Sequence, residues 1–302
     1  MAIRITSGMM HTQLLGNLNN TMYSVNQLQE QVSTGRKINK ASDDPVGATY
    51  ALKYRSELKS NDQYQTNVDA SLSLLNYTDS IMDQAGQVMT KLKELVVQGS
   101  SDTMSEADRT SIKNEVEELK KQMVDLGNSQ LNDKYIFNGQ QYDKKPYELS
   151  STVTSYGDID TDTGAISYTI TSGVTLQANS SGSDFFGSSQ DTDNVFDLMD
   201  KVIEDLDSGD STDLANQLTG IESRTSKMLA ERAEVGAITN RAELVQSRLE
   251  SEEDNVTELQ ANTEDADIDK LMIQVTTAQT IYESALKAAS SVMSTSLVDF
   301  MS

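Results

Sequence analysis

The chain has 302 residues, a formal net charge of −23, one histidine and no cysteine. This charge repels nucleic acids and anionic membrane surfaces, and no run of Lys or Arg provides a local exception. The absence of cysteine excludes disulfides, thiolate metal sites and cysteine nucleophiles, and a single histidine, His11, cannot supply a two-His metal site within one chain.

The length indicates more than one structural unit. A hydrophobic content of 36% and the absence of Trp leave little material for one large core, so an extended molecule of several parts is favoured. No run of about 18 apolar residues could span a bilayer, and the N-terminal region lacks the pattern of a cleavable secretory signal. We therefore expect no membrane span, and any export would use a route without a cleaved signal.

The first predicted helix has no charged residue from Ile5 to Gln29. Apolar residues alternate four and three positions apart, which places one seam on a single face of the helix. The seam consists of Leu18, Met22, Val25 and Val32. Since the back of this helix is polar but uncharged, we expect it to be covered on most sides by the other terminal helix and by further copies of the chain.

Residues 33–48, STGRKINKASDDPVGA, concentrate turn-forming and helix-starting residues between two helical segments. The candidates for the turn and the helix cap are Gly35, Arg36, Asp43, Asp44 and Pro45. Aspartate supplies an N-cap oxygen, and proline is tolerated at the first helical position because its missing N–H would be unpaired there. A helix about 80 Å long is predicted from Pro45 to about Gln98.

After a break at QGSSDTMS, Ser105 and Asp108 resemble a capping box that starts a helix to about Ser129. From Asp133 to about Gln190 the sequence changes to short alternation, which predicts strands. Nine of the sixteen Tyr and Phe residues lie between Tyr135 and Phe196, so we expect a small separate β domain with an aromatic core.

Helices are then predicted at about 194–207 and, after SGDSTD, from Leu214 to about Gln260. A short interruption, ANTEDAD, precedes the last helix, which carries a second seam: Ile268, Leu271, Val275, Tyr282, Leu286, Val292 and Met293. We predict that both seams form subunit interfaces.

The predicted fold class is mainly α with a small β insertion: a long antiparallel helical rod with terminal coiled-coil helices and a distal β-rich domain. The expected segments are an N-terminal polymerisation helix and turn (1–42), the first half of the rod (43–132), the β-rich domain (133–192), the second half of the rod (193–262) and a C-terminal polymerisation helix (263–302).

Two patterns suggest chemistry but are better explained by solvation. DIDTDTG, from Asp158 to Gly164, spaces carboxylates like a calcium loop, but its glycine is one place late and Thr169 occupies the position of the bidentate Glu, so a solvated hairpin turn is favoured. The pairs Glu117–Glu118 and Glu252–Glu253 could be glycosidase carboxylates, but no pocket-forming pattern accompanies them. We expect no enzyme, no cofactor and no metal site.

The segment EQVSTGRKINKASDDPVGA resembles the signature of the flagellin superfamily. DKYIFNG from Asp133, GAITNR from Gly236 and the segment from Glu264 to Met301 extend the resemblance to about 200 residues at the two ends of the chain. Pro45 after the aspartate pair and the ending SLVDFM are more similar to the hook-associated branch at the hook–filament junction than to filament flagellin, which is the alternative.

The resemblance implies a structural subunit of the bacterial flagellum, located outside the cell and exported through the flagellar type III channel. It implies an adaptor that assembles with itself as a ring of about eleven subunits, connecting the preceding hook-associated protein 1 to flagellin. A dedicated export chaperone is expected to bind the C-terminal region, with Leu271, Val275, Tyr282 and Leu286 as candidates. The turn is expected to present Arg36 and Lys37 to acidic residues of a neighbouring subunit, and Asp43 and Asp44 are expected to cap the next helix.

Overall fold

The computed structural model describes residues 7–101, 104–150, 153–209 and 211–301, with side chains described between Met9 and Ser290 except His11. The chain folds as two units. Unit 1 is formed by the described residues up to Ser60 together with those from Glu252 onward, and unit 2 is Asn61–Ser251. Unit 1 is therefore built from both ends of the chain, while unit 2 is continuous.

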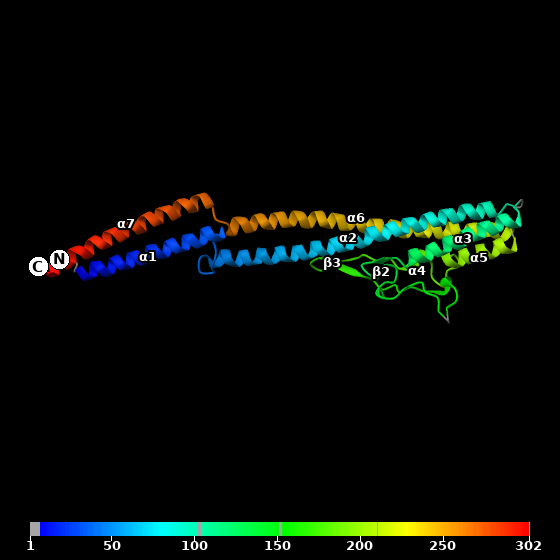
Figure 1. Cartoon of the computed structure of the whole chain (residues 1–302), viewed down its shortest axis with the longest axis horizontal. Coiled ribbons are helices and arrows are strands. Elements are labelled where there is room, and N and C mark those ends of the chain that lie inside the picture. Colours follow the sequence, from blue (N-terminus) through cyan, green and yellow to red (C-terminus); the bar gives the residue numbers. More distant parts are fainter. Residues whose placement is uncertain (1–6, 102–103, 151–152, 210, 302) are drawn as a thin grey trace. The chain divides into compact units, whose positions relative to one another are not determined.

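Unit 1 contains two helices, α1 (Ser7–Thr34) and α7 (Ile268–Met301), which pack against each other and run antiparallel (Figure 1). It also contains the first part of α2 (Pro45–Gly99) and the last part of α6 (Ser211–Glu264). The structure confirms the predicted helix starts at Pro45 and Ile268. The fixed φ of proline defines the first boundary, and the polar break before Ile268 defines the second.

The remaining parts of α2 and α6 form an antiparallel pair in unit 2. Asn61 Nδ2 donates to the carbonyl of Leu249 (2.9 Å), and further along α2 the ion pairs Asp79–Arg232 (2.7 Å) and Lys93–Glu222 (2.7 Å) follow. Residue numbers rise along α2 as they fall along α6, which establishes the antiparallel direction.

Two shorter helices, α3 (Glu106–Gly127) and α5 (Val195–Ser208), pack together in unit 2. Ser105 caps α3 by accepting a hydrogen bond from the backbone N–H of Asp108 (3.3 Å), and its hydroxyl donates to the Asp108 carboxylate (2.7 Å). Asn194 caps α5 by accepting from the N–H of Phe196 (2.9 Å). These polar caps satisfy N–H groups that have no partner inside the helix.

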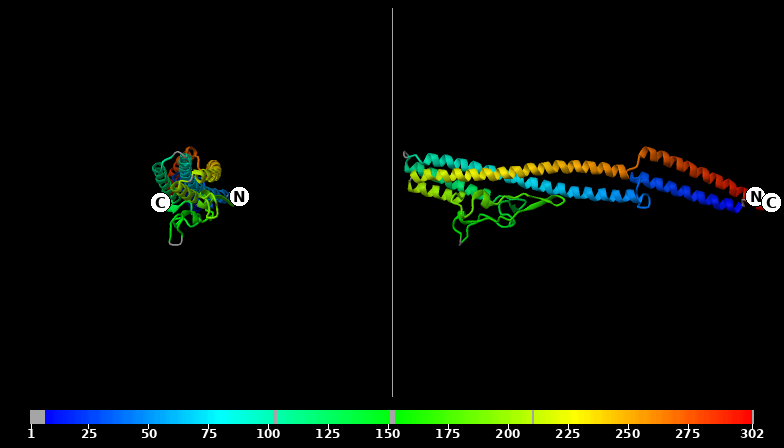
Figure 2. Two further views of the ribbon diagram at one scale, coloured as in Figure 1. Left: turned by 90° about the vertical axis from the view of Figure 1, so that its right-hand side faces the viewer. Right: turned by 180° about the vertical axis from the view of Figure 1, so that it is seen from behind.

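The segment between α3 and α5 contains two short antiparallel hairpins. β1 (Gln130–Leu131) pairs with β2 (Lys134–Tyr135), and β3 (Ser167–Thr171) pairs with β4 (Val174–Gln177), with an irregular register between Thr169 and Thr171. A 3₁₀ turn (Tyr156–Asp158) and a short helix, α4 (Gly182–Phe186), lie between and after them. This segment lies along one side of the unit 2 helices (Figures 1 and 2).

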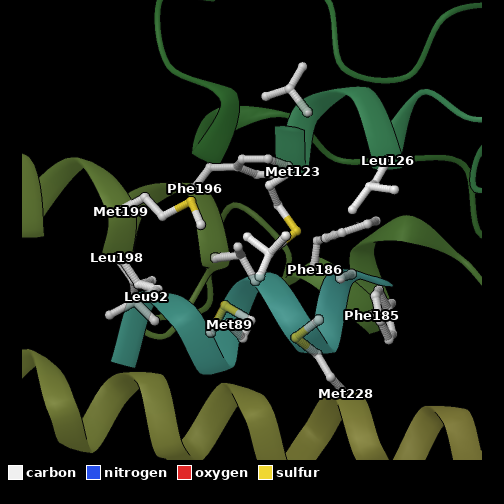
Figure 3. Packing of buried hydrophobic residues seen from close by; sticks show 14 of the residues in the cluster. Met89, Leu92, Met123, Leu126, Phe185, Phe186, Phe196, Leu198, Met199 and Met228 are labelled. Carbon is white, nitrogen blue, oxygen red and sulfur yellow. The ribbon is translucent and has the colours of Figure 1, made fainter. Parts of the chain in front are cut away.

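The mainly α fold with a small β insertion is confirmed, but the prediction of a separate aromatic β domain is wrong. Phe137, Tyr147, Phe185 and Phe186 lie in one core with residues of α2, α3, α5 and α6. Figure 3 shows Phe185 and Phe186 beside Met89 of α2, Met123 of α3 and Met228 of α6. Four strands of two to five residues cannot enclose a core of their own, so their aromatic side chains pack on the helices.

A buried cation links α6 to the loop before α5. Arg224, only 1% exposed, donates from Nε to the carbonyl of Asp193 (2.8 Å) and from Nη2 to the carboxylates of Asp193 (2.5 Å) and Asp191 (3.0 Å). Ser223 and Lys227 also donate to the Asp193 carboxylate. Because the buried charges of Arg224 and Asp193 are paired with each other, this cluster fixes the loop before α5 on α6.

Candidate functional site

The predicted turn lies in unit 1, where it is hydrogen-bonded to the link between α6 and α7. Gly35 ends α1 with a φ of +71°, a conformation that glycine adopts without strain. The carbonyl of Gly35 accepts from the N–H of Ala266 (2.9 Å), and the N–H of Lys37 donates to the carbonyl of Glu264 (2.8 Å). We call residues 35–47 together with residues 262–267 the corner.

Glu264 is the central side chain of the corner. Its side chain is 1% exposed, and Oε1 accepts from Arg36 Nε (2.7 Å) and from Arg55 Nη2. Oε2 accepts from Arg55 Nε (3.2 Å) and from Gln260 Nε2 (3.3 Å). One carboxylate therefore joins the turn after α1, the first part of α2 and the end of α6, and its charge is matched by two guanidinium groups.

The two aspartates of the turn have different roles. Asp44 Oδ1 accepts from the N–H groups of Val46 (3.1 Å) and Gly47 (3.0 Å), which is the geometry of an N-cap on α2, whose first residue is Pro45. Asp43 Oδ2 instead accepts from the N–H groups of Asn39 (3.1 Å) and Lys40 (2.9 Å). Asp43 therefore closes the preceding turn and does not cap the helix, which corrects the expectation that both aspartates cap it.

Arg36 and Lys37 are both exposed and also have partners within the chain, and their contact with acidic residues of a neighbouring subunit stays a prediction. Arg36 pairs with Glu264 of its own chain, and Lys37 Nζ donates to the carbonyl of Asn262 (2.8 Å). Sequence reasoning missed Glu264 and Arg55 because their partners lie at the opposite end of the chain. The sequence signal that could have pointed to Glu264 is the polar break ANTEDAD, which precedes the last helix as the turn at residues 33–48 follows the first.

The predicted seams are covered unequally in unit 1. Val25, Leu271 and Val275 are buried, while Leu18, Val32 and Tyr282 are half-buried. Met22, Ile268 and Leu286 remain 47%, 47% and 42% exposed. Val292 and Met293 lie outside the residues whose side chains are described. Each seam is thus covered only in part within the chain.

Further large apolar side chains outside the two seams are exposed on the same helices. Tyr23 on α1 and Ile273 on α7 are 72% and 69% exposed, and others of this kind are Met9, Met10, Leu15, Met272 and Ile281. Most of the exposed large hydrophobic side chains described for the chain belong to unit 1, although it is the shorter unit. An excess of exposed apolar side chains of this kind is typical of an interaction surface.

The described residues offer no metal cluster and no membrane-crossing helix. Among them, no three His, Cys, Asp or Glu residues are arranged to hold a metal, and no helix combines the length and hydropathy that a bilayer span needs. In the segment Asp158–Gly164, Asp160 accepts hydrogen bonds from Ser189, and Asp162 accepts one from Gln140. The prediction that this segment is a solvated hairpin turn is wrong, because it lies before β3 and the chain turns between β3 and β4 at residues 172–173. Its carboxylates Asp160 and Asp162 instead accept hydrogen bonds from neighbouring loops.

Two family models match the chain. The bacterial flagellin N-terminal helical region covers residues 5–142, and the bacterial flagellin C-terminal helical region covers residues 218–301. The chain belongs to the flagellin family. Together the two matches include both terminal helices and both parts of the corner, so the candidate site lies within the matched regions.

Among curated flagellin-family relatives, flagellar hook-associated protein 3 of Salmonella typhimurium is 27% identical over 150 residues, covering 49% of this chain and 47% of the relative. The chain thus spans about half the length of that relative in the alignment. Flagellin of Bacillus subtilis is 23% identical over 91% of each chain.

Solved structures show the same fold. A putative flagellar hook-associated protein from Vibrio parahaemolyticus has a TM-score of 0.66 at 18% identity, covering 74% of this chain and all of that one. The flagellar junction protein FlgL from Legionella pneumophila has a TM-score of 0.59 at 15% identity, covering 73% of this chain and all of that one.

Proposed function

We propose that the chain is a structural subunit of the bacterial flagellum that acts as an adaptor at the hook–filament junction. The observation that carries the proposal is the exposed apolar surface of α1 and α7 in a chain of the flagellin family. The names of the Salmonella and Legionella relatives support the junction in particular. The role requires no catalytic step and no cofactor.

The terminal helices are the proposed assembly elements. Each seam is covered only in part within the chain, so neighbouring subunits would cover the exposed Met22, Ile268 and Leu286. Burying a large apolar side chain contributes about 1.5–3 kcal/mol, and a surface of many such residues makes assembly favourable. In the proposed ring of about eleven subunits, one end would contact hook-associated protein 1 and the other flagellin.

The same surface needs protection before assembly. We propose that a dedicated export chaperone covers Leu271, Val275, Tyr282 and Leu286 until the chain leaves the cell by the flagellar type III route. Leu271 and Val275 are buried against the chain itself, so chaperone binding would require α7 to separate from α1. Loss of chaperone binding in Leu271→Asp, with binding retained in Leu244→Asp on α6, would support this assignment; equal binding by both variants would oppose it.

The experiment that tests the function is quantification in sheared flagella. Filaments would be separated from hooks, and this chain would be counted against the other filament proteins by mass spectrometry. A few copies at the hook-proximal end are expected from a junction adaptor. Cells lacking the chain should keep hooks but release flagellin into the medium, since the filament would have no base.

Filament flagellin is the second candidate. The alignment with Bacillus subtilis flagellin over 91% of both chains favours it. Thousands of copies along the filament shaft would establish this alternative and exclude the junction role.

A further inference from the structure

A pocket in unit 2 is lined by α2 and by the segment between α3 and α5. It has a volume of about 300 Å³, and α2 contributes Ala70 and Ser73 to its lining. The opposite wall includes the rings of Tyr135, Tyr142 and Tyr168, and most of the remaining lining consists of leucine and isoleucine side chains. A recess with this lining is suited to an apolar side chain.

An exposed leucine lies on α6, also in unit 2. Leu244 is 73% exposed, more than any other large hydrophobic side chain described for the protein. Arg241 and Arg248 lie three residues before and four residues after it, so they share its side of the helix, whereas Glu243 lies about 100° away around the helix. Both arginines are exposed, and neither forms an ion pair with a described residue. We call Leu244 and these two arginines the knob.

The pocket and the knob lie at the same height of the α2–α6 pair. Gln246 Nε2 of α6 donates to the Asp69 carboxylate of α2 (2.9 Å). Because the two helices are antiparallel, Leu244, two residues before Gln246, is level with the part of α2 that begins just after Asp69. Ala70 and Ser73 of the pocket lie in this part of α2.

The pocket and the knob also lie on opposite sides of this helix pair. Val68 of α2 and Ala242 of α6 are buried in one core cluster together with residues of the β3–β4 hairpin. Ala70 and Leu244 each follow one of these residues by two positions, a rotation of about 200°, so each points away from the other helix. Copies that stand side by side in the same orientation would therefore bring the knob of one to the pocket of the next.

The charges near the pocket favour the approach of the two arginines. Asp69, Asp133 and Asp143 are exposed, and each is next in sequence to a residue that lines the pocket. Two lysines lie in the same region: Lys134 Nζ is 4.6 Å from the centroid of a tyrosine ring of the pocket, and Lys144 donates to a neighbouring glutamine. The aspartates outnumber these lysines, so the region attracts a positively charged partner.

We propose that Leu244 of one copy inserts into the pocket of the next copy, with Arg241 and Arg248 beside the aspartates. This inference rests on the proposed assembly. The pocket and the knob are different surfaces of one chain, so they give the head-to-tail contact that closes into a ring. A single inserted side chain buries too little area to hold two chains together. It would instead fix the lateral register of copies that are joined through α1 and α7.

The test uses the absence of cysteine from the chain. A variant with Leu244→Cys and Ser73→Cys is made in cells that lack the native copy, and the assembled flagella are oxidised. The two introduced thiols of one chain lie on opposite sides of the helix pair, so a disulfide can form only between copies. A ladder of covalent oligomers is expected from the hook-proximal fraction on a non-reducing gel. Co-expression of the two single variants should give dimers only.

The matched control is Leu244→Cys with Ser80→Cys. Ser80 is exposed on nearly the same side of α2 as Ser73 but lies about two turns further along, so this pair should give no ladder. An equal ladder from the control refutes the proposed contact, and so does the absence of a ladder when the Ser73 variant is incorporated. Absence of the wild-type chain from the hook-proximal fraction would instead refute the proposed function.

A second measurement applies if the cysteine variants are not incorporated. Leu244→Asp places a charge in the apolar pocket, so the number of chains incorporated per hook should fall roughly tenfold. Leu229→Asp makes the same change at a leucine of α6 that is 59% exposed and lies 15 residues earlier, and it should incorporate like the wild type. Chain secreted into the medium is measured in parallel to separate export from incorporation. Equal incorporation of the two variants would also refute the contact.

Discussion

Arg36 and Glu264 come from opposite ends of the chain and form an ion pair with 2.7 Å between Nε and Oε1. Glu264 is buried and also binds Arg55, whereas both arginine side chains are partly exposed. The carboxylate is therefore the residue on which the corner depends, because removing it would leave two guanidinium groups without their shared partner.

Glu264→Ala should lower the stability of unit 1 by about 2 kcal/mol, because the lost hydrogen bonds are charge-assisted but the arginines can regain water. Hydrogen exchange should become faster in α1 and α7 and stay unchanged in α3 and α5. Glu30→Gln, which removes only an exposed pair with Lys40, is the control and should leave exchange unaltered. Unchanged exchange in Glu264→Ala would show that the corner does not depend on this carboxylate.

The two neighbouring aspartates of the turn should respond differently to substitution. Asp44→Ala should cost about 1 kcal/mol, because two N–H groups at the start of α2 lose their acceptor. Asp44→Asn should retain most of this stability, since an amide oxygen also caps helices. Denaturant unfolding would measure both, and a larger loss in Asp43→Ala than in Asp44→Ala would contradict the cap assignment.

Tyr147→Phe should raise the stability of unit 2 by about 1 kcal/mol. The Tyr147 hydroxyl is buried and has no hydrogen-bond partner among the described residues, while the ring packs against Phe186 and Phe196. Burial also raises the pKa of this phenol, so it stays neutral. Thermal unfolding would compare it with Tyr156→Phe, whose ring is half-buried. A lower melting temperature for Tyr147→Phe would reveal a hydrogen bond to the hydroxyl, such as one through a water.

The Arg224 cluster should make unit 2 sensitive to acid. Burial raises the pKa of Asp193, but hydrogen bonds from Ser223 and Lys227 and the charge of Arg224 outweigh it, and the net pKa lies below the ordinary 3.8. The pKa of Asp191 is also lowered, chiefly by the hydrogen bond from the Ser188 N–H. Because these folded-state pKa values are depressed, the stabilisation is present above about pH 4 and is lost as the pH falls through them.

Asp193→Asn should therefore destabilise unit 2 by on the order of 3 kcal/mol at pH 7, since it leaves the buried Arg224 with less compensation. The difference from the wild type should shrink as the pH falls below 4, where the wild type loses the same interaction. Urea unfolding across this pH range is the measurement. A difference that is constant with pH would assign the effect to packing and not to charge.

The helices could be predicted from the sequence because their ends carry local signals. Pro45, Ser105 and Asn194 mark starts that local chemistry alone specifies. The corner could not be predicted, since pairing Glu264 with Arg36 and Arg55 requires the fold to bring the two ends together. The aromatic residues were misassigned for a related reason: their spacing shows that they cluster, but not whether their neighbours are strands or the faces of distant helices.

The candidate surface was predicted only in part. The seam positions Val25, Leu271 and Val275 are buried within the chain itself, and their contact with other subunits stays a prediction. Tyr23 and Ile273 are more exposed but lie off both seams, so periodicity alone did not select them.

The division of unit 1 between the two ends of the chain also determines the order in which the molecule can fold. Unit 2 is a continuous segment, so its contacts require closing shorter loops than those that join Arg36 to Glu264. We expect the middle of the chain to fold first and the termini to pair last. A chain in which only unit 2 has folded would have two unpaired terminal segments. These segments could pair with the helices of a neighbouring chain as well as with each other.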